Sequence, residues 1–247
     1  VALDTDSADG TDTEGGAITF TNDAPIDSAS GEHNNFSIDV GTVRVNFNAD
    51  LGNTQSLGKL TINEADDGVI FGGADAEVIG SGGAGPVSVI NTDGAIDIGT
   101  TNNVIGGAGI VLNGGAGAAT LTLQTTGDAI RFNGAVTLAS HVDLATKNAG
   151  NAKGGTITFT NDAPVDSASG EHNHLTLNAG DAAIVFNEDI GATQSLGTLT
   201  ITQADAGVIF GGADTATTGG TGPMSGLFVR DSLDFGAGTN EIGGAGL

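Results

Sequence analysis

Apolar residues recur along the chain as short triplets in which two apolar residues flank a small or polar one. This alternation, with a period of two, predicts strands that bury one face. Gly, Asn and Asp separate the triplets and favour turns, because Gly adopts positive φ and the other two hydrogen-bond turn amides. No stretch shows the apolar period near 3.6 residues that a helix would need. The pattern therefore predicts an all-β protein built from short strands.

One triplet returns at nearly constant spacing, with gaps of 27, 24, 27, 34, 27, 27, 24 and 25 residues. Its last residue, called the marker here, is Phe in eight of nine cases. The markers are Phe20, Phe47, Phe71, Ile98, Phe132, Phe159, Phe186, Phe210 and Phe235. A second apolar cluster precedes most markers by nine residues, and a weaker third cluster follows them.

Three short strands in about 25 residues predict one coil of a β-solenoid, in which equivalent residues lie one strand spacing, about 4.8 Å, apart. We predict a parallel β-helix of about nine coils of 24–27 residues, with the markers stacked as one core ladder. A pair of β-sandwich domains is a weaker alternative, because it gives no reason for the same residue type to recur at this spacing. A β-propeller is weaker still, because its blades take about 40–45 residues.

A longer repeat encloses these coils. Residues 15–75 match residues 154–214 without a gap at an offset of 139, with 41 of 61 positions identical. The first five marker gaps also add up to 139, so we interpret the long unit as five coils. We expect one continuous solenoid over 1–247, with copy A at 15–153 and a truncated copy B at 154–247. The widest marker gap predicts a loop insertion at 106–119.

Composition and charge exclude several function classes. The chain has 247 residues, with 30 carboxylates against six Lys and Arg, and a formal net charge of −24. Nucleic-acid binding and attachment to an anionic membrane surface are excluded, because both need clustered cations. No apolar run approaches the ~20 residues of a transmembrane helix, so we expect no membrane insertion by this segment. Cysteine is absent, which excludes disulfides and cysteine-ligated metals.

The candidate metal ligands are carboxylates that follow the markers by three or four positions. They are Asp23, Asp50, Asp75, Asp162, Asp189 and Asp214. In adjacent coils such side chains would stack, and like charges opposed on neighbouring strands destabilise a sheet. A calcium ion would relieve the repulsion, because it binds carboxylate and carbonyl oxygens. Exposure to solvent or hydrogen bonds to turn amides would also relieve it, so calcium is the one cofactor that the sequence leaves open.

The sequence contains no familiar catalytic motif. Lys and Arg are scattered, and Tyr and Trp, which commonly wall sugar-binding grooves, do not occur. With so many carboxylates, a chance pair is no evidence for a glycosidase. We therefore expect no enzymatic activity and assign no catalytic residue. A Glu-His-Asn segment occurs at 32–34 and 171–173, and His172 and His174 would share a strand face, as metal ligands do. We interpret the segment as a polar turn, since only copy B has the second histidine.

Three blocks of the chain resemble a known family. They read LGKLTINEADDGVIFGGAD (57–75), TGDAIRFNGAVTL (126–138) and GGTITFTNDAP (154–164). Repeats of this style are similar to those of filamentous-haemagglutinin-like adhesins and autotransporter passengers, which are large secreted bacterial surface proteins. The likeness covers almost the whole chain. It implies a right-handed parallel β-helix with an extracellular or cell-surface location.

We accordingly expect a structural stalk or filament segment of a longer surface protein, serving adhesion or an extracellular matrix. The expected partners are further copies of the same repeat, in the same chain or stacked end to end, because each coil needs neighbours to cover its edges. One alternative is an adhesin passenger that binds cell-surface glycans or a host surface. A second is a polysaccharide-degrading β-helix enzyme.

Overall fold

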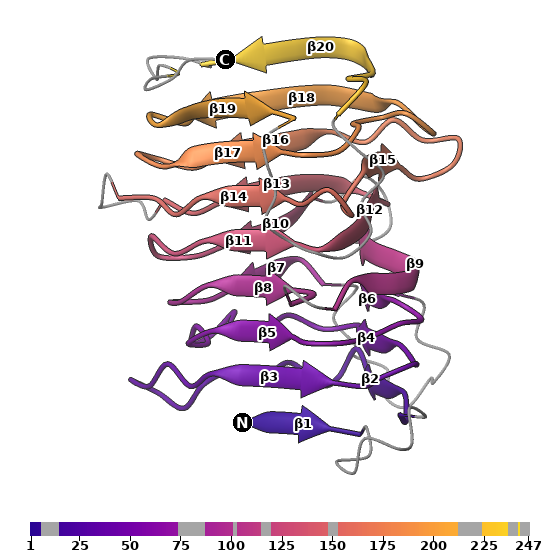
Figure 1. The fold of residues 1–247 in the computed structure, drawn as a ribbon. Helices are drawn as coiled ribbons and strands as arrows, with labels where there is room; N and C mark the ends of the chain where they lie inside the picture. The colour runs from indigo at the N-terminus through magenta and orange to yellow at the C-terminus, as the bar shows by residue number, and fades with distance from the viewer. Residues whose placement is uncertain are drawn as a thin grey trace.

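The computed structural model describes residues 1–5, 15–73, 87–100, 103–114, 120–147, 153–211, 224–236 and 242. Within these ranges the chain forms short strands joined by turns and loops, and it forms no helix. The strands stack one above another from the N-terminal to the C-terminal end (Figure 1). The alternating triplets thus become strands, as their period predicts.

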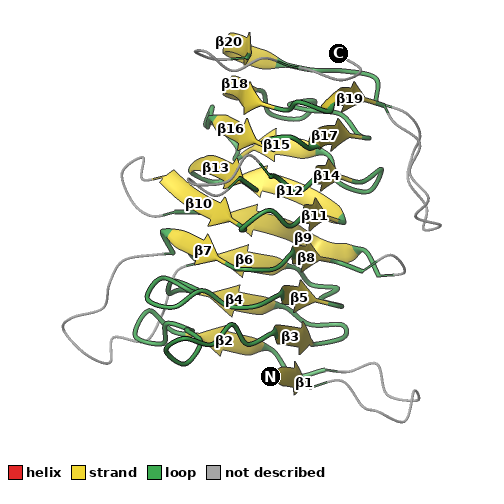
Figure 2. Ribbon diagram, turned by 90° about the vertical axis from the view of Figure 1, so that its left-hand side faces the viewer, coloured by secondary structure: helices red, strands yellow, loops and turns green. Residues whose placement is uncertain are grey.

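Three parallel sheets form the sides of the molecule (Figures 1 and 2). Sheet A contains β1 (Ala2–Asp4), β3 (Phe36–Asp39), β5 (Leu60–Ile62), β8 (Ile96–Ile98), β11 (Ile130–Phe132), β14 (Ile157–Phe159), β17 (Ala183–Phe186) and β19 (Gly207–Phe210). Sheet B contains β2 (Ile18–Phe20), β4 (Val45–Phe47), β6 (Val69–Phe71), β9 (Ile105–Leu112), β12 (Gly134–Leu138) and β15 (Val165–Ser167). Sheet C contains β7 (Val89–Asn91), β10 (Thr120–Gln124), β13 (His141–Ala145), β16 (Leu175–Asn178), β18 (Leu196–Gln203) and β20 (Val229–Phe235).

The chain visits the sheets in the constant order A, B, C, once per coil. Where a coil lacks a named strand, a single bridging residue takes its place: Ile26 and Leu51 in sheet C, and Ile190 and Leu227 in sheet B. This winding is that of a parallel β-helix, so the predicted fold class is confirmed. Within the described ranges the eight strands of sheet A define eight coils, and Ile242 bridges to Ala204 beyond them.

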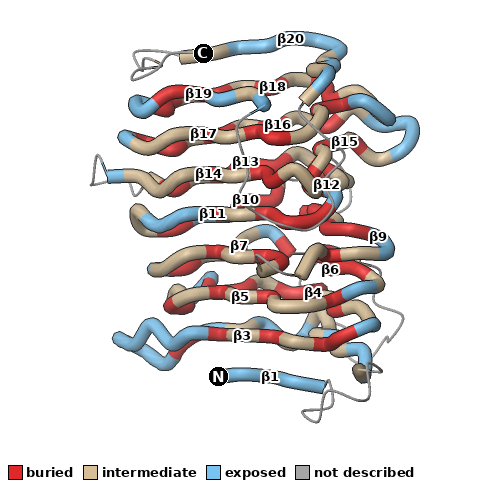
Figure 3. Tube along the Cα trace, viewed as in Figure 1, coloured by how far each residue is buried: buried red, intermediate tan, exposed pale blue. Residues whose placement is uncertain are grey.

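The core is a thin interior filled by apolar residues, and the strands from β3 to β19 carry its buried residues (Figure 3). The side chains of Phe47, Phe71, Phe132 and Phe186 are fully shielded from solvent. Rings on neighbouring coils stack with nearly parallel planes, for example Phe47 on Phe71 at 5.0 Å between centroids and Phe159 on Phe186 at 4.9 Å. Such offset pairs add about 0.5–1.5 kcal/mol each beyond the burial of the rings.

The marker ladder is not continuous, which corrects the sequence-based prediction. Phe20, Phe47 and Phe71 form one ladder in sheet B, where Leu112 continues it. Ile98 lies in sheet A above Ile62 and starts a second ladder through Phe132, Phe159, Phe186 and Phe210. Phe235 lies in sheet C opposite Ile201. The steps from Phe71 to Ile98 and from Phe210 to Phe235 are therefore two thirds of a coil.

The 139-residue unit accordingly does not contain five whole coils. From β2 to its counterpart β14 the chain makes fourteen steps from sheet to sheet, through Ile26, β3, β4, Leu51 and then β5 to β14. Five coils would need fifteen steps. Each strand of copy B therefore lies one sheet behind its counterpart: β2 is in sheet B and β14 in sheet A, and β3 is in sheet A and β16 in sheet C. The same sequence is thus presented on a different face of the molecule in each copy.

The central coils are longer than predicted. Ile62, Ile98 and Phe132 are consecutive rungs of sheet A, so two successive coils take 36 and 34 residues. The prediction of a loop at 106–119 is wrong for its first half, because those residues belong to β9, which pairs with β6 and β12. The remainder, 115–119, lies outside the described residues. A register shift between Gly134 and Val136 takes up the extra residues of β9 against β12.

Candidate functional site

Two of the predicted carboxylates hold the backbone of a neighbouring coil. Asp50 Oδ1 accepts hydrogen bonds from the Ser88 amide at 2.7 Å, the Val89 amide at 3.0 Å and the Ser88 hydroxyl at 3.0 Å. Its Oδ2 accepts a bond from the Asn53 side-chain amide at 2.8 Å. The carboxylate is thus satisfied by N–H and O–H donors, which is one of the two arrangements that the sequence left open.

Asp189, the counterpart of Asp50 in copy B, likewise accepts hydrogen bonds from the backbone of a neighbouring coil. Its Oδ1 accepts bonds from the Ser225 amide and, at 2.7 Å, from the Gly226 amide. Its Oδ2 accepts a bond from the Ser225 hydroxyl at 2.7 Å. The hydrogen bond from the Ser225 side chain, followed by the bonds from the backbone, lowers the pKa of Asp189 below its ordinary value of 3.8. The carboxylate is therefore ionised at neutral pH.

Two of the other predicted metal ligands, Asp23 and Asp162, lie in the described chain. Asp23 is exposed after β2, and Asp162 is half-buried after β14, where its backbone amide lies 3.4 Å from the Thr160 hydroxyl. Asp75 and Asp214 lie outside the described residues. Among the residues that the structure describes, no three His, Asp or Glu side chains gather within reach of one metal ion. Calcium binding stays a prediction.

The most exposed repeated feature is a loop at a corner of the coil, which we call the corner loop. It comprises residues 27–34 in copy A and 166–173 in copy B, and both read DSASGEHN. In copy A it follows the sheet C residue Ile26 and leads into β3 of sheet A. In copy B its first two residues end β15 of sheet B, and it leads into β16 of sheet C. The same loop therefore projects from two different corners.

Both corner loops rest on the same hydrogen bonds from the next coil. Asp27 Oδ1 accepts bonds from the Thr54 and Gln55 amides at 2.9 and 3.2 Å. Asp166 Oδ1 accepts the equivalent bonds from Thr193 and Gln194 at 2.9 and 3.1 Å. These carboxylates were not among the sequence candidates. The signal was their identical setting in both copies, together with the repeated Thr-Gln-Ser that supplies the donors.

The histidines of the corner loops are held by serine. The Nδ1 atom of His33 lies 2.9 Å from the Ser56 hydroxyl, and that of His172 lies 3.1 Å from the Ser195 hydroxyl. His172 thus contacts Ser195, whereas His174 contacts His141, so the two histidines have different neighbours. The polar-turn interpretation describes both copies.

His174 instead pairs with His141, a contact that sequence reasoning missed. His141 begins β13 and His174 immediately precedes the neighbouring β16, and their ring centroids lie 4.2 Å apart. The His174 backbone amide donates to His141 Nδ1 at 3.1 Å. Partial burial, then the neighbouring His174, lowers the pKa of His141 below its ordinary 6.5, although Asp143 opposes the shift. The Nδ1 lone pair that accepts the amide favours the neutral ring.

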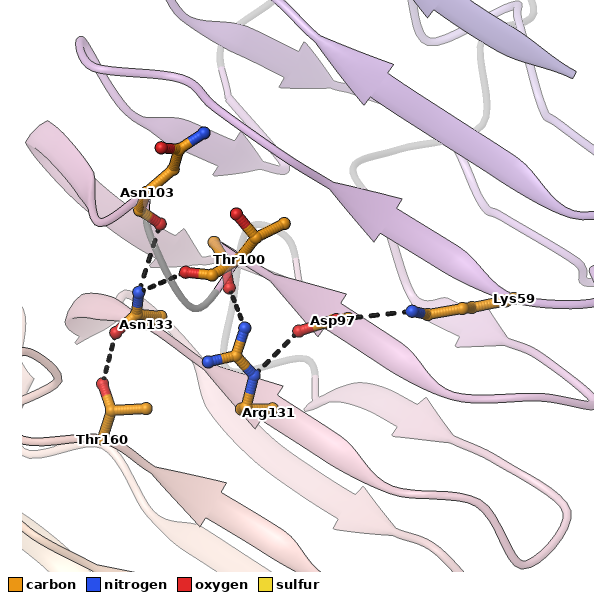
Figure 4. A network of polar contacts seen from close by, with 8 residues as sticks. Lys59, Asp97, Thr100, Asn103, Arg131, Asn133 and Thr160 are labelled. Atoms are coloured by element: carbon orange, nitrogen blue, oxygen red, sulfur yellow. Dashed lines mark hydrogen bonds and ion pairs between the residues drawn. The ribbon is translucent and has the colours of Figure 1, made fainter. Parts of the chain in front are cut away.

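Half of the chain's cations gather on the outer surface of sheets A and B. On sheet A, Asp97 accepts bonds from Lys59 Nζ at 3.4 Å and from Arg131 Nε at 2.9 Å, and so links three coils (Figure 4). Below the outer surface of the same coils, the Asn133 side chain donates to the Thr100 and Asn103 carbonyls and accepts from the Thr160 hydroxyl. On sheet B, Arg44 pairs with Asp67. These contacts join successive coils and reduce the local acidity of the walls.

A hollow of about 260 Å³ lies at the C-terminal end, where Phe210, Met224 and Leu227 line it with Ser225 and Gly226. The hollow lies beside the last described rung of the sheet A ladder, which is Phe210. The described part of the chain contains no helix long and apolar enough to cross a membrane.

Comparison with known proteins gives one informative similarity. The chain is 29% identical over 224 residues, or 78% of its length, to outer membrane protein A of Rickettsia rickettsii. It spans only 10% of the length of that protein. No protein-family model matches the chain, and no solved structure matches it.

Proposed function

We propose that this chain is a structural stalk segment of a large bacterial surface protein, with no catalytic activity of its own. The observation that carries the proposal is the unbroken stacking of apolar residues through all eight coils of the described chain. Such a rod gives length in proportion to the number of its coils. Similarity to a far longer outer membrane protein supports a place at the cell surface.

The acidic walls fit this role. With a net charge of −24, rods repel one another sideways and stay dispersed outside the cell. The carboxylates of Asp50 and Asp189 link neighbouring coils by accepting hydrogen bonds from backbone amides. Their role is thus mechanical.

The test changes the length of the stalk in its own surface protein. Deleting or duplicating one 139-residue unit should move a distal epitope by roughly 22 Å relative to the membrane, since fourteen thirds of a coil advance at about 4.8 Å per coil. Energy transfer from a membrane dye to the labelled epitope measures this displacement. An unchanged distance in a variant that folds would contradict the stalk role.

A second candidate function is glycan or host binding through the corner loops. The segment 15–34 is identical to 154–173 at 18 of 20 positions, whereas 35–75 matches 174–214 at only 23 of 41. The loop tip is exposed, and Ser30 and Glu32 are kept in copy B as Ser169 and Glu171. A glycan array probed with the wild-type chain and with the variant Ser30→Arg/Ser169→Arg tests this role. Binding that the variant keeps would place the ligand elsewhere.

A further inference from the structure

The two corner loops are held to the coil that follows them by the same contacts. In both copies the first Asp of the loop accepts two backbone amides, and the histidine lies beside a serine hydroxyl. In both, a glycine amide of the following coil also donates to the last carbonyl of the loop, from Gly58 to Asn34 at 2.8 Å and from Gly197 to Asn173 at 2.9 Å. Toward the following coil the two loops are therefore alike.

The copy B loop also rests on the coil that precedes it. The Leu138 carbonyl accepts hydrogen bonds from the Ala168 amide and, at the end of the loop, from the Asn173 side-chain amide, both at 2.8 Å. One residue further on, the His174 amide donates to His141 Nδ1 at 3.1 Å. This contact lies where the loop enters β16, next to β13 (Figure 1). A side chain that titrates near neutral pH thus holds the end of the loop.

Copy A differs at this point. The residue equivalent to His174 is Asn35, which has no titratable side chain and accepts a hydrogen bond from the Lys59 amide of the following coil at 2.9 Å. Its carbonyl accepts from the Val1 ammonium at 2.6 Å, and acid keeps that donor protonated. The titratable residues inside the two loops are identical. The His141–His174 contact therefore distinguishes the response of the copy B loop to acid from that of the copy A loop.

The hydrogen bond from the His174 amide requires a lone pair on His141 Nδ1. The neutral His141 ring carries its proton on Nε2, so acid adds the second proton at Nδ1, and two N–H donors then face each other. The ring centroids lie 4.2 Å apart, so charge on both rings adds repulsion. In the described structure His174 Nδ1 is buried with no hydrogen-bond partner to compensate. Acid thus removes an attraction and adds a repulsion at one point.

Titratable neighbours reach His141 from its own strand and from the loop end. Burial, and then His174, lower the pKa of His141 below 6.5, although Asp143 on the same face of β13 opposes the shift. Thr120, its partner on β10, is uncharged. At the loop end, Glu171 accepts a hydrogen bond from the Asn173 side chain at 2.7 Å. The closed contact therefore binds the proton less readily than the open loop, and falling pH favours opening.

We propose that acid releases the end of the copy B corner loop from the preceding coil at the His141–His174 contact, whereas the identical loop of copy A stays in place. The release is local, because the inward neighbours Val142 and Leu175 stay paired and buried. It is a property of the fold and does not depend on the stalk role. For the binding role considered above, copy B becomes the acid-responsive loop and copy A the constant one.

Amide hydrogen exchange on the intact chain tests the proposal, with copy A as the internal control. Peptides that extend into β3 or β16 distinguish the two loops despite their identical sequence. Between pH 7.5 and pH 5.0, protection at the end of the copy B loop, corrected for the intrinsic effect of pH, should fall about two- to tenfold, as for one lost hydrogen bond. Protection of the copy A loop should change much less. Equal losses in both loops, or no loss in copy B, would overturn the proposal.

Three variants identify the group responsible. His141→Asn should abolish the pH response of the copy B loop. The matched control His172→Asn, which changes a histidine that copy A shares, should keep the response. His174→Asn retains the donating backbone amide and should keep most of it. Circular dichroism checks that each variant folds. A response that survives His141→Asn would overturn the proposal, and two loops that exchange alike would reject acid release while leaving the stalk role standing.

Discussion

Phe71 lies under Leu112 in sheet B, whereas Ile98, the next marker along the chain, lies above Ile62 in sheet A. A separation of 27 residues spans a full coil from Phe20 to Phe47 but only two thirds of a coil from Phe71 to Ile98. The second copy of the long repeat is therefore presented one sheet behind the first. A surface feature of the repeat, such as the corner loop, faces different sides of the rod in successive copies.

The core ladder should dominate stability. Replacing Phe159 with Ala removes a fully packed ring between Phe132 and Phe186 and should lower the free energy of unfolding by about 3–5 kcal/mol. The control Thr158→Ala changes the outward neighbour in the same strand and should alter stability by less than about 0.5 kcal/mol. Urea unfolding followed by circular dichroism measures both. Similar losses in the two variants would mean that the ring is not part of the core.

The hydrogen bonds that the Asp189 carboxylate accepts should stabilise the chain less in acid. Because hydrogen bonds from Ser225 lower the pKa of Asp189 in the folded state, its contribution is present above the ordinary value of 3.8 and is lost as pH falls through the lower folded pKa. Asp189→Asn should therefore lower the melting temperature at pH 7 and make little difference near pH 2. The control is Asp231→Asn, an exposed carboxylate on β20. An Asp189→Asn effect that is the same at both pH values would contradict this account.

The His141–His174 pair predicts a second pH dependence near neutrality. Burial lowers the pKa of His141, so the unfolded chain binds the proton more readily, and stability is lost as pH falls through 6.5. The groups facing His141 are His174 across the strand pair, Thr120 on the other side and Asp143 two residues on. His141→Asn should flatten the melting temperature between pH 7.5 and pH 5.5. A wild-type melting temperature that rises over this interval as pH falls would refute the prediction.

Calcium should stabilise the chain little. The oxygens of Asp50 and Asp189 accept bonds from amides and hydroxyls, and these donors compete with a cation for the same lone pairs. We expect a few millimolar calcium to shift the melting temperature no more than sodium chloride of equal ionic strength. Thermal unfolding with each salt measures the difference. A larger, saturable shift with calcium would show a specific site, as the carboxylate prediction requires.

Much of the fold could be predicted from the alternating triplets, because the alternation around a residue such as Phe47 predicts both a strand and an inward side chain. The assignment of strands to sheets could not be predicted, since a loop can add residues to a partial coil until its length equals that of a full one. For the same reason, the contacts of the candidate site residues could not be predicted. Asp50 was identified as unusual, but its partner Ser88 lies 38 residues on. His141 meets His174 only because β13 and β16 are paired.

The most direct test of the winding places cysteines at the outward position Ile70 and at a residue of the next coil. The neighbour of Ile70 differs between the described structure and a unit of five whole coils. The structure pairs Ile70 with Val111, whereas stacking of Phe71 under Ile98 would pair it with Asp97. Oxidation of Ile70→Cys/Val111→Cys should close an intramolecular disulfide, since paired parallel strands lie about 4.8 Å apart and disulfides join Cα atoms about 4.4–6.8 Å apart. Ile70→Cys/Asp97→Cys should remain reduced. Rapid closure of the second pair and not the first would contradict the arrangement of sheets described above.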